Sequence, residues 1–503
     1  MNTDVVARLR EALDAADYTY DTVAEALGAD AQAALGRNET TPGLKATASG
    51  GALATLIRLW ILQVPVPLAA AEQALPGLVD QLCAEGILDR SIAEVTPRVD
   101  VRPYGTDEGS LLIASDLTPG LDGTPSRMGT SHVLGISPAS TSLAELTIRR
   151  PVARALDLGT GCGVQALHLT EHVDQVVATD LNPRALWLTG INAALNDVRI
   201  DVREGDFFAP VAGEQFDLIV TNPPFVISPA SGERFVYRDS GLPGDRVVED
   251  IVRAAPHLLA PGGTAQILGN WLVLRDQPWQ ERLDGWVTGN DGAPGCSAWA
   301  VQRELADPAS YVEMWLKDSG HHPSTGGDVA DYRIRYDTWL SWFEEIGAEG
   351  VGFGWINLRR TDGQARLRAE EWPYEVAQPL GPEVDDYFAR EATLDTLDDG
   401  GLLRSRLKLR ADVLQQTEGA PGAADPVVIM LRQQIGMRRA RQVDTATAAW
   451  VGACDGDLPL GAIVDAVAAL LESEPGFDAD AARVEALGRA RELVAEGYLV
   501  VTD

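Results

Sequence analysis

The sequence predicts an α/β protein whose central part is a parallel, doubly wound sheet. Three observations predict it: short apolar runs from residue 150 onward, helical segments between them, and a glycine-rich turn directly after the first run. Strands that alternate with helices form parallel sheets. The runs lie at 153–158, 175–179, 216–221 and 264–268. Two later runs, at 298–305 and 351–358, are expected to complete the sheet.

The 503 residues exceed what one compact core usually holds, so several domains are expected. Apolar residues before residue 100 recur at helical spacing, and those after 360 follow no single period. We therefore predict four parts: a mainly helical N-terminal domain (1–100), an α/β domain with a β-rich lead-in (101–360), a β-rich segment (361–440) and a small C-terminal domain (441–503). The last two form a small α+β region.

The two ends of the chain share a short pattern. Residues 82–88 and 493–499 are identical at five of seven positions, and in both a helical segment stops at a glycine before a strand. This favours a winged-helix-like domain at each end; the alternative is an ordinary amphipathic helix followed by a strand. Because both ends are acidic, we expect them to dock on proteins rather than bind duplexes.

Composition excludes several classes of protein. The chain is 45% hydrophobic and 23% charged, which is ordinary for a globular protein. Its four cysteines form no CxxC pair, so we expect no disulfide framework, no metal site and a reducing, cytoplasmic location. No run approaches about 20 uninterrupted apolar residues, so neither a signal peptide nor a membrane span is expected. The net charge of -33 does not exclude nucleic acid, because charge can differ between domains.

The glycine-rich turn Gly159-Thr160-Gly161-Cys162-Gly163 follows the first strand and precedes a helix. Glycines allow the backbone to approach a bound nucleotide closely, since side chains would collide with it. The spacing also satisfies a loose dinucleotide fingerprint. Asp157 separates the two interpretations, because a carboxylate at the strand end repels a pyrophosphate and attracts an ammonium group. S-adenosylmethionine carries an ammonium group and no phosphate, so we predict it as the cofactor.

Acidic residues also follow the next two strands. Asp180, with Leu181 after it, ends the second strand, where a carboxylate can accept both ribose hydroxyls. Asp206 follows the third strand and can accept a hydrogen bond from the adenine amino group, with Phe207 against the ring. One such acid alone is more often a turn residue or a helix cap. Three in order at successive strand ends favour a nucleoside-binding site.

The most specific motif is Asn222-Pro223-Pro224-Phe225, which follows the fourth strand. Two consecutive prolines cannot continue a central strand, so the motif is predicted to be a rigid loop. The Asn222 side-chain oxygen and the Pro223 carbonyl can accept both hydrogens of a planar NH2 group and hold its nitrogen in line with a methyl donor. Phe225 can stack on a flat substrate group. All four residues are predicted to be catalytic, and Asn222 also to border the cofactor.

Residues 150–270 resemble the class I methyltransferases that carry an Asn-Pro-Pro-aromatic motif. These include release-factor glutamine N5-methyltransferases, ribosomal RNA guanine-N2 methyltransferases of the methyltransferase small domain type, and adenine-N6 enzymes. The resemblance implies a Rossmann-like, seven-stranded core and the cofactor contacts above, with the loop around 137–141 closing over the cofactor. Phe225 replaces the tyrosine usual in the glutamine enzymes, and residues 237–245 match their pattern in part. The substrate is therefore left open.

Two acceptors are considered. A nucleobase amino group of RNA, most simply ribosomal RNA, is preferred because of Phe225 and because Arg404, Arg406, Lys408 and Arg410 occupy alternate positions, which on one strand would form a surface for phosphates. The alternative for that surface is a solvated sheet face. A protein glutamine in a translation factor is the second acceptor, favoured by the acidity and the expected docking domains. A non-catalytic, cofactor-binding scaffold is a third possibility, which the intact motif disfavours.

Overall fold

The structure, a computed structural model, describes residues 2–106, 109–123, 129, 131–224, 226–229, 242–289, 292–421, 426–471 and 478–502. The chain forms two compact units rather than the four predicted parts. Unit 1 holds residues 1–144 and 150–373, and unit 2 holds residues 145–149 and 374–503. No helix within these described ranges is long and apolar enough to cross a lipid bilayer.

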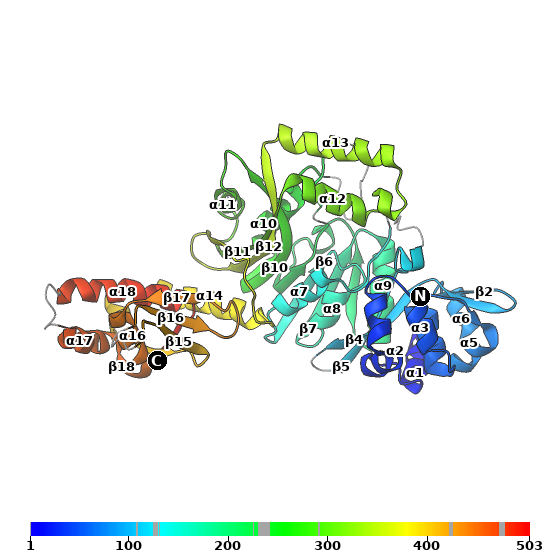
Figure 1. Cartoon of the computed structure of the whole chain (residues 1–503), viewed down its shortest axis with the longest axis horizontal. Coiled ribbons are helices and arrows are strands. Elements are labelled where there is room, and N and C mark those ends of the chain that lie inside the picture. The colour runs from blue at the N-terminus through cyan, green and yellow to red at the C-terminus, as the bar shows by residue number, and fades with distance from the viewer. Residues whose placement is uncertain are drawn as a thin grey trace. The chain divides into compact units, whose positions relative to one another are not determined.

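A large mixed sheet forms the centre of unit 1 (Figure 1). Its described strands are β6 (Val152–Leu158), β7 (Val173–Asp180), β8 (Ile200–Glu204), β9 (Phe216–Thr221), β10 (Leu259–Leu274), β11 (Cys296–Ala306), β12 (Ala348–Arg360) and β13 (Arg366–Glu371). They lie in the order β13-β11-β12-β10-β9-β6-β7-β8. The strands from β6 to β10 run parallel, whereas β12 is antiparallel to both of its neighbours. The predicted doubly wound sheet is thus confirmed.

The sheet has one described strand more than the seven expected. β13 pairs in parallel with β11, with Ser297 opposite Arg366. Its sequence, RLRAEE, is polar, as is common at a sheet edge, so it could not be found from apolar runs. The pairing places the end of unit 1 at residue 373, later than the boundary predicted at 360.

Helices cover both faces of the sheet. The described helices of this region are α7 (Pro138–Leu146), α8 (Val164–Leu169), α9 (Pro183–Leu195), α10 (Arg246–Leu258), α11 (Trp279–Thr288), α12 (Pro308–Asp318) and α13 (Val329–Glu345). Alternate residues of one strand enter different cores: Val177 packs in the core that contains α10 and α11, whereas Val176 and Ala178 pack with α8. This two-residue period is what a strand buried on both faces requires.

The N-terminal region is mainly helical, as predicted. Its described elements are α1 (Thr3–Ala15), α2 (Tyr20–Leu35), α3 (Thr41–Ala46), α4 (Ala52–Leu56), the π-helical turn η1 (Ile57–Ile61), β1 (Val66–Pro67), α5 (Leu68–Ala74), α6 (Val79–Ala84), β2 (Leu88–Arg90) and β3 (Glu94–Pro97). From α4 onward the order is helix, strand, two helices and two strands, with a β1-β3-β2 sheet, which is the order of a winged-helix unit. The region is not a separate unit, because Leu9 of α1 and Leu188 of α9 belong to one hydrophobic core.

A β-hairpin leads into the α/β core. It consists of β4 (Asp100–Thr106) and β5 (Gly109–Ser115). Asn192 of α9 and Asn196, which follows the helix, hydrogen-bond to the backbone of β5. Asn192 bonds to the N–H and C=O of Ala114, at 2.7 and 2.8 Å, and Asn196 to those of Leu112, at 2.8 and 2.7 Å. These side chains satisfy an otherwise open strand edge and fix the hairpin on α9.

Unit 2 is a small α+β domain. Its described elements are α14 (Gly381–Thr396), α15 (Asp399–Arg404), β14 (Arg406–Leu409), β15 (Val413–Glu418), β16 (Val428–Gln433), β17 (Ala440–Val443), α16 (Thr445–Gly452), β18 (Asp455–Pro459), α17 (Leu460–Leu471), α18 (Ala479–Ala495) and β19 (Leu499–Thr502). They form two three-stranded sheets, β18-β14-β19 and β15-β16-β17. From α16 to β19 the order is helix, strand, two helices and strand, and β14 supplies the third strand from upstream.

The predicted arginine face does not form as expected. Arg404 ends α15 instead of lying on the strand, so only Arg406 and Lys408 are exposed on β14. Arg410 is bound by Glu383, at 3.0 Å, and by Asp412. A nearby arginine cluster is similarly engaged: Arg432 bonds to Gln416 at 2.7 Å, Arg438 lies 3.3 Å from Glu375, and Arg441 lies 2.7 Å from Glu496. The alternating pattern was misleading because the strand begins only at Arg406 and because Arg410 pairs with acids.

Candidate active site

A cleft of about 710 Å3 opens at the carboxyl ends of β6, β7 and β9. The order of the strands reverses between β6 and β9, and ligands of doubly wound sheets bind at this switch point. The cleft gathers nearly all described residues that were predicted to be functional: Asp157, Gly159, Thr160, Gly161, Asp180, Leu181, Asp206, Phe207, Asn222, Pro223 and Pro224. Phe225 lies outside the described residues. The cleft therefore unites the predicted cofactor and catalytic positions.

The glycine-rich turn takes the left-handed backbone conformation that its glycines allow. Gly159, Gly161 and Gly163 have φ angles of 71°, 58° and 86°. Gly163 is not among the residues that line the cleft. A Cβ atom there would lie 3.1 Å from the Thr189 side chain, so this glycine permits close packing between the turn and α9. Gly163 thus lies behind the wall of the cleft, whereas Gly159 and Gly161 line it, and its predicted contact with the cofactor stays a prediction.

Asp157 is buried at the end of β6, with 1% of its surface exposed. Its Oδ2 atom accepts hydrogen bonds from the Thr160 hydroxyl at 2.6 Å and from the backbone N–H of Ala166 at 3.0 Å. Burial raises the pKa of this carboxyl to about 7, although both hydrogen bonds act in the opposite direction. Asp157 thus shapes the glycine-rich turn as well as lining the cleft.

Asp180 connects the end of β7 to the glycine-rich turn. Its Oδ2 atom accepts the backbone N–H of Gly161 at 3.0 Å, and its Oδ1 atom accepts that of Asn182 at 2.8 Å. Burial raises the pKa of the carboxyl, while these backbone hydrogen bonds lower it. A carboxylate oxygen can accept a second hydrogen bond, so both oxygens retain capacity for a ligand. Two vicinal hydroxyls fit this arrangement.

The third acid lies on the rim of the cleft. Asp206 is exposed in the turn after β8. Its neighbour Phe207 has a φ angle of 41°, which is unusual for a residue with a bulky side chain. Phe207 is held partly buried against the core beneath the sheet. Such backbone strain concentrates at ligand-binding sites, and here it directs an aromatic ring to the cleft wall.

Asn222 follows the last residue of β9 and lines the cleft. Its side-chain oxygen, Oδ1, is buried and accepts no hydrogen bond in the described structure. A buried acceptor without a donor costs free energy, so such an atom in a native protein calls for a ligand or a functional explanation. Pro223 and Pro224, which follow, also line the cleft. Asn222 therefore offers a preformed acceptor to a donor group that enters the cleft.

The opposite wall of the cleft comes from residues 131–140. Ser137 and Ser140 line it, so the loop predicted to close over the cofactor lies at the site. Ser137 caps α7, because its hydroxyl accepts the Ser140 N–H at 3.2 Å while Ser140 Oγ accepts the Ser137 N–H at 2.7 Å. Gln165 of α8 donates to the Ser140 carbonyl at 2.7 Å. This wall is thereby tied to the helix that follows the glycine-rich turn.

An ion pair that no sequence pattern indicates supports this wall. Asp116 follows β5 and accepts two hydrogen bonds from Arg184 of α9, at 2.9 and 2.6 Å. The other oxygen of Asp116 accepts the Val133 N–H at 2.8 Å. His132, beside Val133, lines the cleft, and burial lowers its pKa. No motif connects residues 116 and 184, so their pairing could be found only in three dimensions.

Together, these features define a class I methyltransferase fold with a cleft at the switch point of the sheet. A comparison with protein families agrees: residues 135–283 match the methyltransferase small domain. The resemblance of residues 150–270 to methyltransferases of the Asn-Pro-Pro-aromatic group is thus confirmed. Residues 15–98 and 385–501 match two further families, both described as domains of unknown function.

Several curated proteins are similar to the central part of this chain. The ribosomal protein uL3 glutamine methyltransferase of Bradyrhizobium diazoefficiens is 33% identical over 31% of this chain and 52% of its own length. The release factor glutamine methyltransferase of Cereibacter sphaeroides is 35% identical over 27% of this chain and 52% of its own length. The ribosomal RNA small subunit methyltransferase C of Pasteurella multocida is 32% identical over 29% of this chain and 40% of its own length. The chain spans about half the length of the first two relatives.

A solved structure also resembles this chain. It is the T. thermophilus 16S rRNA N2 G1207 methyltransferase in complex with AdoMet and guanosine. The identity is 17%, the match covers 50% of this chain and 67% of that chain, and the TM-score is 0.28.

Proposed function

We propose that this protein is an S-adenosylmethionine-dependent N-methyltransferase that acts on a planar NH2 group. The observation that carries the proposal is the buried Asn222 Oδ1 atom, which lacks a hydrogen-bond donor and lines a cleft that also contains Asp157 and Asp180. An NH2 group supplies the missing donor. The similarity of residues 135–283 to a methyltransferase family supports the same activity.

The residues present fit S-adenosylmethionine. The left-handed glycines 159 and 161 leave room for a close approach to the backbone. Asp157 suits the ammonium end, Asp180 the ribose hydroxyls, and Asp206 with Phe207 the adenine ring. When bound there, the cofactor supplies an electrophilic methyl group.

Asn222 prepares the acceptor nitrogen for that group. The lone pair of an amide or exocyclic NH2 is delocalised, so its nitrogen is a weak nucleophile. When Asn222 Oδ1 and the Pro223 carbonyl accept its two hydrogens, the nitrogen is oriented and its lone pair is directed at the methyl carbon. The same two acceptors would hold the nitrogen while it accepts the methyl group, and water would take the proton that the nitrogen loses. The two prolines fix the backbone that holds both acceptor atoms.

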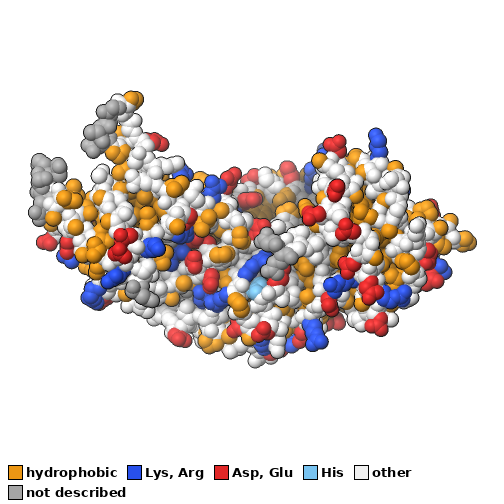
Figure 2. Space-filling view, turned by 90° about the horizontal axis from the view of Figure 1, so that it is seen from below, with side chains coloured by type: hydrophobic (Ala, Val, Ile, Leu, Met, Phe, Trp, Pro, Cys, Tyr) orange, Lys and Arg blue, Asp and Glu red, His pale blue; other side chains and the backbone are white. Residues whose placement is uncertain are grey.

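Among acceptors, we now favour the side chain of a protein glutamine over a nucleobase. The preference for RNA depended on the predicted arginine face. In the structure, Arg410 forms ion pairs with Glu383 and Asp412. Figure 2 shows acidic and basic side chains interspersed over one side of the molecule, with no broad basic patch. Similar curated proteins include several named as glutamine methyltransferases. A substrate from the translation machinery would place the enzyme in the cytoplasm, with the terminal regions as docking elements for a protein.

A nucleobase of ribosomal RNA is the second candidate. It is favoured by the similarity to a ribosomal RNA methyltransferase and by Arg406 and Lys408, which are exposed side by side on one face of β14. A phosphate-binding role for these two residues would make activity depend on salt concentration. Charge reversal at Arg406 and Lys408 should then lower transfer, most strongly at low salt. Unchanged transfer would favour the protein acceptor.

The activity is tested by transfer of a tritiated methyl group into cell lysate. Label that survives nuclease and is lost with protease identifies a protein acceptor, and the reverse identifies RNA. The Asn222→Ala variant should bind S-adenosylmethionine normally and lose about 100-fold or more of the transfer rate. Wild-type protein that binds no S-adenosylmethionine in calorimetry would refute the proposal, and an Asn222→Ala variant of full activity would refute the role of this residue.

A further inference from the structure

The chain between β11 and β12 forms a helical insertion, α12 and α13. Local sequence explains both helices. Asp307 caps α12 by accepting the Ser310 N–H at 3.0 Å, and Pro308 occupies the first turn. Asp328 caps α13 by accepting the Asp331 N–H at 2.9 Å.

The insertion holds the segment that follows the Asn-Pro-Pro motif. The Ile227 N–H donates to the Tyr311 hydroxyl of α12 at 2.8 Å, and the Ile227 carbonyl accepts the indole N–H of Trp339 of α13 at 3.0 Å. Ile227, Tyr311 and Trp339 are all fully buried. Both polar groups of one residue are thus bound by one side chain from each helix. The backbone N–H and C=O of Ile227 therefore bond to the insertion instead of to a neighbouring strand.

The other end of the segment is fixed as well. Thr221, the last residue of β9, donates its hydroxyl hydrogen to the Leu158 carbonyl at 2.7 Å. Between Thr221 and Ile227, the rings of Pro223 and Pro224 restrict the backbone further. Asn222 therefore lies in a short segment that is anchored to the sheet on one side and to the insertion on the other. Its position depends on both anchors.

We infer that Tyr311 and Trp339 are positioning residues for the methyl-acceptor site. Neither residue lines the cleft. Both hold Ile227, and through it they maintain the placement of Asn222 and Pro223. A shift of about 1 Å in groups that orient a nucleophile can reduce a rate about 100-fold. This inference builds on the proposed function, but the placement of the segment can be measured without any substrate.

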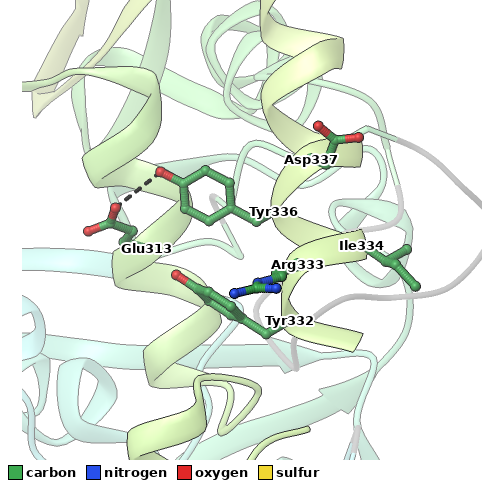
Figure 3. Close-up of a pocket in the computed structure, with 6 residues that line it drawn as sticks. All are labelled: Glu313, Tyr332, Arg333, Ile334, Tyr336 and Asp337. Carbon is green, nitrogen blue, oxygen red and sulfur yellow. Dashed lines mark hydrogen bonds between the residues drawn. The ribbon is translucent and has the colours of Figure 1, made fainter. Parts of the chain in front are cut away.

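The same insertion offers a matched control. Figure 3 shows Tyr336 of α13 beside Glu313 of α12, to which its hydroxyl donates at 3.0 Å. Burial and this hydrogen bond raise the pKa of Tyr336 to about 12. The bond joins the two helices at the surface of the insertion and involves no residue of the 222–229 segment. Tyr311→Phe and Tyr336→Phe each delete one tyrosine hydroxyl, the first on α12 and the second on α13 of the insertion.

The first experiment is amide hydrogen exchange on the full chain, read on peptides that contain Val226 and Ile227. In Tyr311→Phe, the freed Ile227 N–H should exchange about tenfold faster or more. Trp339→Phe, which removes the donor to the Ile227 carbonyl, should act in the same direction. Tyr336→Phe should leave these peptides unchanged. Equal exchange of these peptides in the wild type, Tyr311→Phe and Trp339→Phe would overturn the inference, whatever reaction the protein catalyses.

The second experiment measures turnover with the acceptor identified by methyl transfer. Tyr311→Phe should lower kcat about tenfold or more and leave the dissociation constant of S-adenosylmethionine within about twofold. Tyr336→Phe should retain wild-type kcat. Because Tyr311 and Trp339 hold the same residue, the double variant should lose less than the product of the single losses. If kcat of Tyr311→Phe equals that of Tyr336→Phe, the inference fails; if wild type itself transfers no methyl group, only the proposed function fails.

Discussion

Thr221 and Leu158 join the two halves of the site through one hydrogen bond. The Thr221 hydroxyl donates to the Leu158 carbonyl at 2.7 Å, and both residues are buried. Leu158 follows Asp157 on the predicted cofactor side, and Thr221 precedes Asn222 on the acceptor side. The bond adds to the parallel pairing of β6 with β9, in which Leu158 lies opposite Thr221, and so ties the two halves together at the switch point of the sheet.

Thr221→Val should destabilise the fold and impair turnover. Valine has nearly the same shape but leaves the Leu158 carbonyl without its donor, which should lower the free energy of unfolding by about 1–3 kcal/mol. Urea denaturation measures this loss. Thr221→Ser keeps the hydroxyl and should retain more of the stability and the activity. Equal stability of the valine and serine variants would show that the hydrogen bond contributes little.

Asp180→Ala should weaken binding of S-adenosylmethionine. The variant removes the acceptor expected for the ribose hydroxyls and also releases the Gly161 and Asn182 N–H groups. Loss of charge-assisted hydrogen bonds of about 1.5–3 kcal/mol corresponds to a rise of about 10- to 150-fold in the dissociation constant, measurable by calorimetry.

Asp180→Asn separates the two effects. Its side-chain oxygen can still accept one backbone N–H, so the glycine-rich turn should be better preserved than in the alanine variant. If the asparagine variant has wild-type affinity, a carboxylate at this position is not required for binding. If both variants bind as tightly as wild type, Asp180 does not contact the cofactor.

The central fold could be predicted because its signals are local. Apolar runs of β6, β7 and β9, separated by helical segments, define strands that are buried on both faces, and the glycines of the first turn fix its conformation. β13 could not be found this way, because its polar sequence lacks the apolar run of a central strand. The shared core of α1 and α9 also escaped prediction, since no pattern indicates which helices pack together across nearly 200 residues.

The site was predictable to the extent that its residues follow strand ends. Asp157, Asp180 and Asn222 were located because parallel strands bring their carboxyl ends to one edge. Asp116 and Arg184 were missed, since neither belongs to a motif and their contact depends on how the β4–β5 hairpin lies on α9. Arg404 and Arg410 were wrongly predicted to lie on one strand. Alternating residues share a face only where the backbone is extended, whereas Arg404 ends a helix and β14 covers only Arg406–Leu409.

Glu383→Ala should strongly destabilise unit 2. Glu383 is buried and lies 2.8 Å from Arg390 and 3.0 Å from Arg410. Its removal leaves two largely buried guanidinium groups with less negative charge nearby, and breaking such an ion pair typically costs about 3–5 kcal/mol. Arg406→Ala, at an exposed position of β14, is the control and should change stability by less than about 0.5 kcal/mol. Equal denaturation midpoints for the two variants would contradict a structural role for this cluster.

Binding of S-adenosylmethionine should tighten as the pH rises through about 7. Burial raises the pKa of Asp157 to about 7, so in the free protein at pH 6 this carboxyl is mostly protonated and neutral. An ammonium group favours the ionised form, and binding should therefore release a proton. Affinity should fall by up to about tenfold per pH unit below 7, and fall again above about 8, where an α-amino group loses its own proton.

Calorimetry between pH 6 and pH 8, in buffers of different ionisation enthalpy, measures both the affinity and the proton released. Asp157→Asn cannot ionise, and its affinity should be lower and nearly independent of pH between 6 and 7.5. The unliganded protein should show the opposite trend in stability. Because the folded form of Asp157 binds a proton more tightly than the unfolded form, its contribution to stability declines as the pH rises from about 4 to about 7. Wild-type affinity that is constant from pH 6 to pH 7.5, without proton release, would show that Asp157 does not face the ammonium group.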